Sequence, residues 1–433
     1  MIRKPRGTND ILPENIKEWL FVENEFRKIC SEYNFGEIRT PMFEKTSLFK
    51  RGVGDTTDIV KKEMYNVLSD DALYKYKNDK FKSSDSFTLK PEGTAPIVRA
   101  FVENKLYAEK QPTKLFYITP CFRHERPQAG RLRQFHQFGI ETFSATSATA
   151  DAEIISLADV FFRRLGIDNL TLKINSVGCS KCREVYHKEL KKFLEPKLDD
   201  LCVTCNERYI TNPLRILDCK NEKCQNTIAE APLITDYLCD ECSAHFEELK
   251  SALDIVEVDY IVDPKIVRGL DYYTKTAFEF ISTDLGSQAT VCGGGRYNGL
   301  VKQVDGPETP GVGFGLGIER LLMVLKARKF KFNDEKTLDV FIVTFDKETK
   351  MKGMEFVTKL RKKGVAADID HLERSFKAQF RYSDALNSKY TIILGSDEIE
   401  NNKISLKNMK TGEQIEMQMD NIEKIIELVR ESK

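Results

Sequence analysis

The sequence of 433 residues lacks three features, and each absence argues against a class of protein. Its 67 lysines and arginines equal its 67 aspartates and glutamates, so no overall field attracts it to nucleic acid. Any contact with RNA must therefore come from local basic patches. No apolar run is long enough to cross a bilayer. The N-terminal stretch lacks the apolar segment of a secretory signal, so we expect a cytosolic (cytoplasmic) protein with no membrane contact.

In the absence of a secretory signal, the eleven cysteines are predicted to be thiols or metal ligands rather than disulfides. Eight of them form four close pairs: Cys179 and Cys182, Cys202 and Cys205, Cys219 and Cys224, Cys239 and Cys242. Two such pairs can complete a tetrahedral site, so the segment predicts up to two structural zinc ions. A catalytic zinc is not expected, because four thiolates leave no open position. The alternative is a reduced, helical, cysteine-rich insertion without metal.

Periodicity predicts helices and strands arranged in about two to three domains. Apolar residues at helical spacing predict core helices at residues 13–33 and 151–165. Residues 35–43 are predicted to form a strand, and residues 61–90 to form strands and loops. After a charged linker at 326–336, strands and helices alternate to the end of the sequence, which predicts a small α/β domain with a mixed sheet.

Residues 116–143 are predicted to form two antiparallel strands with a basic connection. The connection contains Arg123, His124, Arg126, Arg131 and Arg133, with a Pro-Gln-Ala-Gly turn at residues 127–130. Side chains of one sign repel each other unless an anion lies among them. Planar guanidinium groups suit phosphate oxygens. The connection is therefore predicted to bind a phosphorylated ligand rather than to serve only as a solvated tip.

Three further segments are candidates for ligand contact. Glu92 and Thr94 lie between a predicted strand and a predicted helix, where they either cap the helix or converge on a ligand. Alternate glycines across residues 311–317 lie on one face of a predicted strand, which leaves a flat slot for a nucleotide. The triple glycine at 293–295 is either a turn or a second place where a ligand lies against bare backbone.

The connection sequence FRHERP, followed by QAGRLRQFHQFGIE, resembles motif 2 of class II aminoacyl-tRNA synthetases in the form used by histidyl-tRNA synthetases. RGLDYY at 268–273 resembles a signature of that family, residues 311–325 resemble motif 3, and the region of Pro41 resembles motif 1. The resemblance covers nearly the whole chain. It implies fold class α/β with an α+β catalytic core: a class II antiparallel sheet with helices, a helical cysteine-rich insertion, and a C-terminal mixed-sheet α/β anticodon-binding domain.

The resemblance implies an enzyme that activates histidine with ATP and magnesium and transfers it to tRNA(His), acting as a homodimer through motif 1. A carboxylate is already ionised at neutral pH, so its attack on the α-phosphate needs alignment and cations rather than a general base. By resemblance, Arg123 and Arg268 flank the α-phosphate as catalytic residues, and Gln128 meets the acceptor end of tRNA. The implied ATP-binding residues are Arg123, Glu125, Arg131, Phe135 and Arg320. The implied histidine-binding residues are Glu92, Thr94, Gln137, Glu141, Arg268, Tyr272, Tyr273 and Tyr297.

We expect catalytic core segments at 1–169 and 256–326, an insertion at 170–255 and an anticodon-binding domain at 337–433. The alternative function is a non-catalytic paralogue, the regulatory subunit of ATP phosphoribosyltransferase. That paralogue typically lacks the C-terminal domain and catalytic motif residues, both of which are present here. A zinc-dependent RNA-binding module without catalysis would leave motifs 2 and 3 unexplained. Because no implied substrate contact lies in the insertion, we expect loss of zinc to spare histidine activation.

Overall fold

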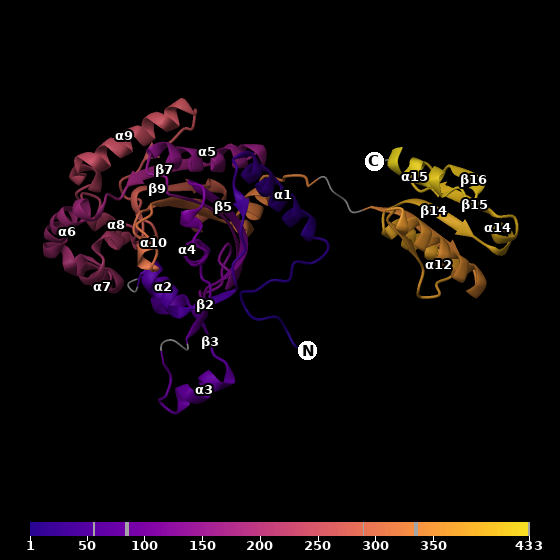
Figure 1. Ribbon diagram of the computed structural model, residues 1–433, viewed down its shortest axis with the longest axis horizontal. Helices are drawn as coiled ribbons and strands as arrows, with labels where there is room; N and C mark the ends of the chain where they lie inside the picture. Colours follow the sequence, from indigo (N-terminus) through magenta and orange to yellow (C-terminus); the bar gives the residue numbers. More distant parts are fainter. Residues whose placement is uncertain (55–56, 83–85, 289, 333–336, 432–433) are drawn as a thin grey trace. The chain divides into compact units, whose positions relative to one another are not determined.

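The computed structural model divides into two compact units, Met1–Phe332 and Asn333–Lys433 (Figure 1). The residues described are 1–54, 57–82, 86–288, 290–332 and 337–431. Among them, no helix is both long and apolar enough to span a membrane. Part of the predicted linker at 326–336 lies outside the described residues.

The first unit is built on a sheet of eight strands in the order β1-β5-β6-β11-β10-β9-β7-β8. The strands are β1 (Gly36–Glu37), β5 (Thr113–Phe122), β6 (Gln134–Phe143), β11 (Gly311–Gly317), β10 (Thr290–Tyr297), β9 (Thr274–Ile281), β7 (Thr171–Ser176) and β8 (Ile261–Val262). The six inner strands pair antiparallel, whereas β1 and β8 join the edges in parallel. The hairpin predicted at 116–143 is confirmed, because β5 and β6 pair from Thr113 with Phe143 to Phe122 with Gln134.

One face of this sheet carries the main hydrophobic core. Helices α1 (Ile16–Glu32), α5 (Ala148–Arg164) and α11 (Ile318–Ala327) bury their apolar stripes there. Phe26 of α1 stacks on Phe138 of β6 with ring centroids 4.4 Å apart. Alternate residues of a strand point to opposite faces, so burial of Phe138 and Ile140 on this face directs Gln137 and Glu141 to the other. The helices predicted at 13–33 and 151–165 are confirmed.

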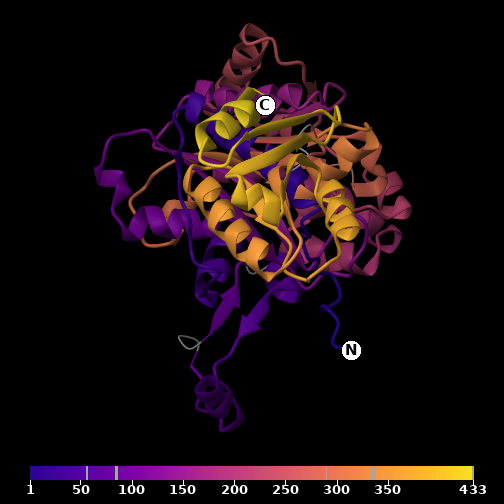
Figure 2. The same ribbon diagram turned by 90° about the vertical axis from the view of Figure 1, so that its right-hand side faces the viewer.

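Two local predictions differ from the structure. Residues 35–43 are not one strand, because β1 ends at Glu37 and β2 (Phe43–Lys45) joins a separate small sheet with β4 (Phe87–Leu89) and β3 (Tyr65–Val67). Within the predicted strands and loops of 61–90, residues 70–77 form helix α3 (Asp70–Lys77). The missed signal was its start: the Ser69 side chain accepts the Ala72 N–H, and two aspartates follow. In both views α3 lies at the end of an arm that leads away from the main sheet (Figures 1 and 2).

The cysteine-rich segment is helical, as predicted. It contains α6 (Ser180–Leu194), α7 (Val203–Thr211), α8 (Glu222–Thr227) and α9 (Asp240–Ile255), and α9 packs against α5 (Figure 1). Its own hydrophobic cluster includes Tyr186, Leu190 and Ile216. The segment belongs to the first compact unit, and the division of the chain into an insertion and two core segments stays a prediction.

The second unit has a five-stranded sheet in the order β13-β12-β14-β15-β16. Its strands are β12 (Leu338–Thr344), β13 (Ala367–Ile369), β14 (Ser388–Leu394), β15 (Lys403–Asn408) and β16 (Gln414–Gln418). Its helices are α12 (Lys347–Lys362), α13 (Phe376–Ala385), α14 (Ser396–Glu400) and α15 (Ile422–Glu431). The first three strands in this order pair in parallel and the rest antiparallel, which confirms the predicted mixed sheet.

Candidate active site and cysteine clusters

The face of the large sheet opposite the main core has a row of glycines at its centre. Gly139 of β6, Gly315 of β11 and Gly293 of β10 are direct neighbours across the ladder. A Cβ atom at Gly139 would lie 2.2 Å from Cζ of Tyr117, and one at Gly293 would lie 2.5 Å from an Nη atom of Arg268. The missing side chains therefore leave room for functional groups of the site. The triple glycine at 293–295 belongs to β10, so its interpretation as a turn is wrong.

A cleft of about 180 Å³ opens over part of this glycine row. Its lining includes Arg123, Glu125, Arg131, Phe135, Gln137, Arg268, Thr290, Gly293, Gly315, Gly317, Glu319 and Arg320. All five residues implied for ATP, together with Arg268 and Gln137, are thus brought to one place. They come from the connection between β5 and β6, from the start of β6, from the loop before β9 and from the start of α11, and these segments lie close together only in the folded chain.

Cations dominate the hairpin side of the cleft. Arg123 donates from Nε to the Pro91 carbonyl at 2.8 Å, and its guanidinium lies 5.2 Å from the centre of the Phe135 ring. The Glu125 carboxylate lies between two arginines, 3.8 Å from Arg123 and 3.5 Å from Arg131. One carboxylate cannot neutralise both guanidinium groups, so this side keeps a net positive charge.

The opposite side of the cleft is held by α11 and β10. Arg320 donates to the carbonyl of Gly130 at 3.0 Å and to that of Thr290 at 2.7 Å. It therefore ties the hairpin turn to β10. Gly130 adopts a φ of +72°, which favours glycine in this turn. Burial, followed by the neighbouring arginines, lowers the pKa of Arg320, a sign that the site is built for a negatively charged ligand.

Sequence reasoning missed two carboxylates that position these groups. Glu279 of β9 pairs with Arg268, and its other oxygen accepts the Thr290 hydroxyl at 2.9 Å. Burial alone would lower the pKa of Arg268, but the charge of Glu279 and the interactions with Tyr273 and Tyr272 together outweigh it, and the pKa is raised. Glu319 of α11 accepts the backbone N–H of His136 at 2.9 Å and lies 3.0 Å from its ring Nδ1. A charged residue inside an apolar strand was the signal that could have revealed Glu279.

Buried carboxylates lie farther along the same face. Glu141 of β6 is fully buried, and its Oε2 accepts the Tyr297 hydroxyl at 2.5 Å. Burial raises the pKa of Glu141 to about 8. Gly313 of β11 is its direct partner in the ladder, and a Cβ there would lie 2.1 Å from the same carboxylate oxygen. This oxygen can occupy its position only because residue 313 has no side chain.

Glu92 caps the start of the helix that follows it. Its two carboxylate oxygens accept the N–H groups of Thr94 and Ala95, each at 2.8 Å, at the start of α4 (Thr94–Glu103). The capping alternative is therefore confirmed, although an ionised carboxylate has about four acceptor positions and keeps capacity for another donor. Burial raises the pKa of Glu92 as well. Gln137 connects this end to the cleft, because its Oε1 accepts the Gly93 N–H at 3.0 Å.

Tyrosines complete the carboxylate end. The rings of Tyr272 and Tyr273 have centroids 4.6 Å apart, and Tyr297 contacts Tyr272 edge-on at 5.5 Å. Within the described ranges, three buried polar atoms here lack a hydrogen-bond partner: the hydroxyls of Tyr117 and Tyr272, and Oε1 of Glu141. Buried polar atoms without partners cost free energy. This arrangement therefore fits a polar ligand that donates and accepts hydrogen bonds.

Gln128 lies apart from both ends. It is exposed at the hairpin tip, where it and Arg131 exchange backbone hydrogen bonds at 3.1 and 2.9 Å. Among the residues implied to contact ATP, histidine or tRNA, Gln128 lies outside the cleft. The others line the cleft or belong to the buried carboxylate end of the same sheet face.

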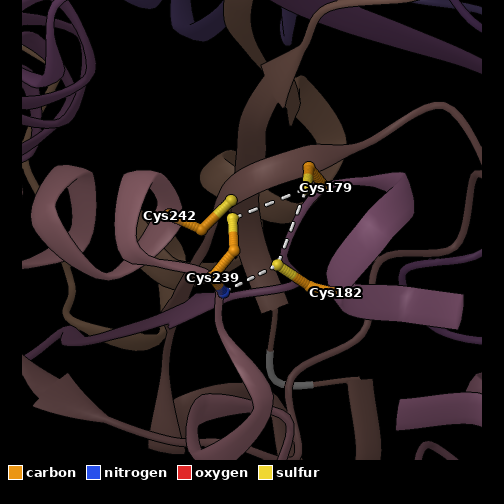
Figure 3. Close-up of side chains that lie close together, drawn as sticks. All are labelled: Cys179, Cys182, Cys239 and Cys242. Atoms are coloured by element: carbon orange, nitrogen blue, oxygen red, sulfur yellow. Dashed lines mark hydrogen bonds between the residues drawn. The ribbon is translucent and has the colours of Figure 1, made fainter. Parts of the chain in front are cut away.

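The eight paired cysteines converge into two clusters. The first cysteine cluster contains Cys179, Cys182, Cys239 and Cys242 (Figure 3), and the second contains Cys202, Cys205, Cys219 and Cys224. In each cluster the sulfur atoms all lie within 4.8 Å of one another. Each cluster therefore joins two of the four pairs, and the first joins pairs that are far apart in the sequence.

The sulfur geometry fits a tetrahedral metal ion. Cys179 Sγ lies 3.6 Å from Cys182 Sγ and 3.9 Å from Cys239 Sγ, and the Cys202 and Cys219 sulfurs are 3.9 Å apart. These distances are too long for a disulfide bond of about 2.05 Å. A tetrahedron with metal–sulfur bonds of about 2.3 Å has edges of about 3.8 Å. Four sulfur donors at this spacing are the set that structural zinc prefers.

Helix starts also favour thiolates in these clusters. Cys179, Cys202 and Cys239 are the N-caps of α6, α7 and α9. The free N–H groups of a helix start favour negative charge. Burial opposes ionisation of Cys179 and Cys202, but hydrogen bonds from nearby N–H and thiol groups lower the pKa of each to about 7.

Comparison with known proteins gives consistent matches over nearly the whole chain. The histidyl-tRNA synthetase family profile matches residues 7–321, and the anticodon binding domain profile matches residues 339–428. The chain is 55% identical to a histidine–tRNA ligase of Caldanaerobacter subterraneus subsp. tengcongensis, covering 98% of this chain and 99% of that protein. It is 53% identical to the histidine–tRNA ligase of Clostridioides difficile, covering 98% of each. The crystal structure of apo S. aureus histidyl-tRNA synthetase shares 40% identity with a TM-score of 0.81, covering 98% of this chain and all of that one.

Proposed function

The chain belongs to the histidyl-tRNA synthetase family, and we propose that its glycine-floored site performs histidine activation with the residue roles given below. As a member of this family it is an aminoacyl-tRNA ligase, which activates histidine with ATP and transfers it to tRNA(His). One observation carries the residue assignment: the five ATP candidates and Arg268 line a single cleft. The full-length similarity to ligases supports this function rather than that of a phosphoribosyltransferase regulatory subunit.

In activation, a histidine carboxylate oxygen attacks the α-phosphorus of ATP, and the bond from that phosphorus to the pyrophosphate oxygen breaks. Negative charge builds on the α-phosphate oxygens as this happens. Arg123 and Arg268 reach the cleft from different segments, so they can contact those oxygens from two sides. Glu279 restrains the Arg268 guanidinium, which reduces the reorganisation needed during the reaction.

The remaining cleft residues hold ATP. Phe135 offers a ring for stacking on adenine, and Arg131 and Arg320 supply cations for the other phosphates. Glu125 accepts from donors on the nucleotide while it lies between Arg123 and Arg131. Magnesium accompanies ATP in this proposal.

The carboxylate end selects histidine. Glu141 and Tyr273 bracket the two imidazole nitrogens, and Tyr272 and Tyr297 line the pocket around them. Glu92, Thr94 and Gln137 accept or support the α-ammonium group. An imidazole can donate from one nitrogen and accept at the other, so it completes buried groups that an apolar side chain would leave unpaired.

The second step requires tRNA. Gln128 is exposed at the hairpin tip, from which it can meet the acceptor end, and residues 339–428 match an anticodon binding domain. We place the homodimer contact at the region of Pro41, where the chain leaves the large sheet after β1. The expectation of a cytosolic location stays a prediction.

Zinc in both cysteine clusters is part of the proposal, supported by the sulfur spacing and the helix N-caps. Purified protein should contain up to two zinc ions per chain. Replacing Cys205 and Cys219 with serine should remove one ion, and replacing Cys182 and Cys242 should remove the other. Metal analysis checks both. Replacement of Cys121, a buried cysteine outside the clusters, is the control, and a metal-free wild-type protein with eight titratable cluster thiols would contradict the proposal.

Pyrophosphate exchange into ATP, measured over a panel of amino acids, tests whether the proposed residues select histidine. Histidine should be the only amino acid that supports rapid exchange. Exchange supported equally by an amino acid without an imidazole would show that the Glu141 end does not select the substrate.

A further inference from the structure

The loop that carries Arg268 is anchored to the sheet at its start, where Asn175 of β7 donates from Nδ2 to the carbonyls of Pro264 at 3.2 Å and Ile266 at 2.9 Å. Residues 263–273 connect β8 to β9 without forming a strand. Val267 is buried in the hydrophobic cluster of the cysteine-rich insertion, whereas the next residue, Arg268, lines the ATP cleft. The chain therefore passes from the core of the insertion to the reacting centre within one residue.

Two side chains of the insertion hold this loop. Arg215 donates from one Nη atom to the Arg268 carbonyl at 3.1 Å and from the other to the Gly269 carbonyl at 2.9 Å. Asn212 donates from Nδ2 to the Asp271 carboxylate at 2.9 Å. The two arms of one guanidinium thus fix the two consecutive peptide groups on either side of Gly269. A planar fork restrains orientation as well as position.

Packing alone does not immobilise this interface. A cavity of about 460 Å³ lies between the insertion and the loop, and its lining includes Asn212, Arg215, Arg268, Asp271 and Tyr273. Beside this cavity, hydrogen bonds therefore add to the packing of Val267 in setting the loop's position.

The second cysteine cluster fixes the segment from which these contacts come. Cys205 and Cys219 bracket the chain that carries Asn212 and Arg215, and both sulfurs belong to this cluster. Arg208, also within the bracketed segment, donates to the Arg215 carbonyl at 3.2 Å. It also pairs at 3.0 Å with Asp58, which lies outside the insertion. A metal ion bound by the cluster would therefore restrain this short segment, which Arg208 also holds, next to the loop that carries Arg268.

We propose that Arg215, supported by Asn212, is a positioning residue for activation: it sets the location of the Arg268 guanidinium from the insertion. This inference rests on the proposed catalytic role of Arg268. A catalytic group displaced by about 1 Å can lose on the order of a hundredfold in rate. On this proposal, loss of zinc from the second cysteine cluster should lower the rate of activation instead of sparing it, although the insertion supplies no substrate contact.

The test is histidine-dependent pyrophosphate exchange with Arg215→Ala, Arg215→Lys, Asn212→Ala and the control Lys192→Ala. Lys192 is an exposed residue of α6 in the same insertion. We expect Arg215→Ala to lower kcat about tenfold or more with little change in the KM for ATP. Arg215→Lys should recover only part of this loss, because an ammonium group cannot span two carbonyls in the same planar geometry. Lys192→Ala should match wild type.

A double-mutant cycle distinguishes positioning from general support of the fold. In an Arg268→Ala background, Arg215→Ala should lower kcat by less than twofold, because the guanidinium that Arg215 is proposed to position is absent. An equal loss in both backgrounds, or a kcat within twofold of wild type for Arg215→Ala, would overturn the inference. If Arg215→Ala does not fold, Asn212→Ala and Arg215→Lys enter the same cycle under the same criteria. Failure of the underlying function would instead appear as absent exchange in the wild-type enzyme.

Discussion

The two ends of the active site lie on one sheet face but have opposite electrostatic character. At the phosphate end, arginines approach a cleft that opens to solvent, and the Arg131 side chain is 44% exposed. At the histidine end, Glu141 and Glu92 are buried and burial raises their pKa values. In the proposed mechanism, the first end stabilises charge that appears during the reaction, whereas the second end binds the histidine side chain. Substitution of Arg268 at the first end should therefore act on kcat, and substitutions at the second end on the KM for histidine.

The largest effect is expected for Arg268→Ala. Loss of a preorganised cation at a developing charge should lower kcat for pyrophosphate exchange about a hundredfold or more. Arg131→Ala, at a more exposed guanidinium of the same cleft, should cost much less and act mainly on the KM for ATP. If the two variants lose kcat equally, the phosphate end does not depend on the buried, Glu279-restrained arginine.

A smaller and opposite pattern is expected for Glu141→Gln. The amide keeps the shape but cannot ionise to become a charged acceptor for the imidazole, so the KM for histidine should rise about ten- to a hundredfold while the KM for ATP stays within a few-fold. Tyr297→Phe, which removes only the hydroxyl that contacts Glu141, is the matched variant and should have a weaker effect. A parallel rise in both KM values would show that the two ends are not separate.

The glycine strand allows a comparison of stability at the two ends. Gly313→Ala places a methyl group 2.1 Å from Glu141 and 2.2 Å from the Ile140 carbonyl, so it should destabilise the fold by about 1–3 kcal/mol. At Gly317 the nearest atom to an added Cβ lies 3.8 Å away, on Arg320, so Gly317→Ala should leave stability nearly unchanged and affect the KM for ATP. Thermal or denaturant unfolding measures the first effect, and equal destabilisation by both variants would contradict it.

The smallest effect concerns pH and stability without ligand. The pKa of Glu141 is about 8 in the folded protein against an ordinary value of 4.5, so the folded state binds more protons between these values. Its contribution to stability is complete below about pH 4.5 and is lost as pH rises through about 8. Glu141→Gln should remove this part of the decline, measured as the difference in Tm between pH 5 and pH 9. Glu109→Gln, at an exposed carboxylate, should leave the decline unchanged.

Local sequence was enough to predict the arginine-rich hairpin, the glycine-faced strand and the four cysteine pairs. Each depends on near neighbours: alternation sets which side chains share a strand face, and a two-residue gap brings two sulfurs together. The same local reasoning predicted a continuous strand at 35–43, because it could not detect that β1 and β2 belong to two different sheets.

Only the tertiary structure decided which distant groups meet. Cys179 joins Cys239 across 60 residues, Glu279 meets Arg268 across a loop, and Arg215 reaches the backbone of that loop. Sequence spacing carries no information on such pairs, because chain separation sets the cost of closure but not the partner. The sequence by itself thus determined the chemical groups of this enzyme. Pairing of the strands and packing of the insertion determined which carboxylate restrains the Arg268 guanidinium and which arginine contacts its loop.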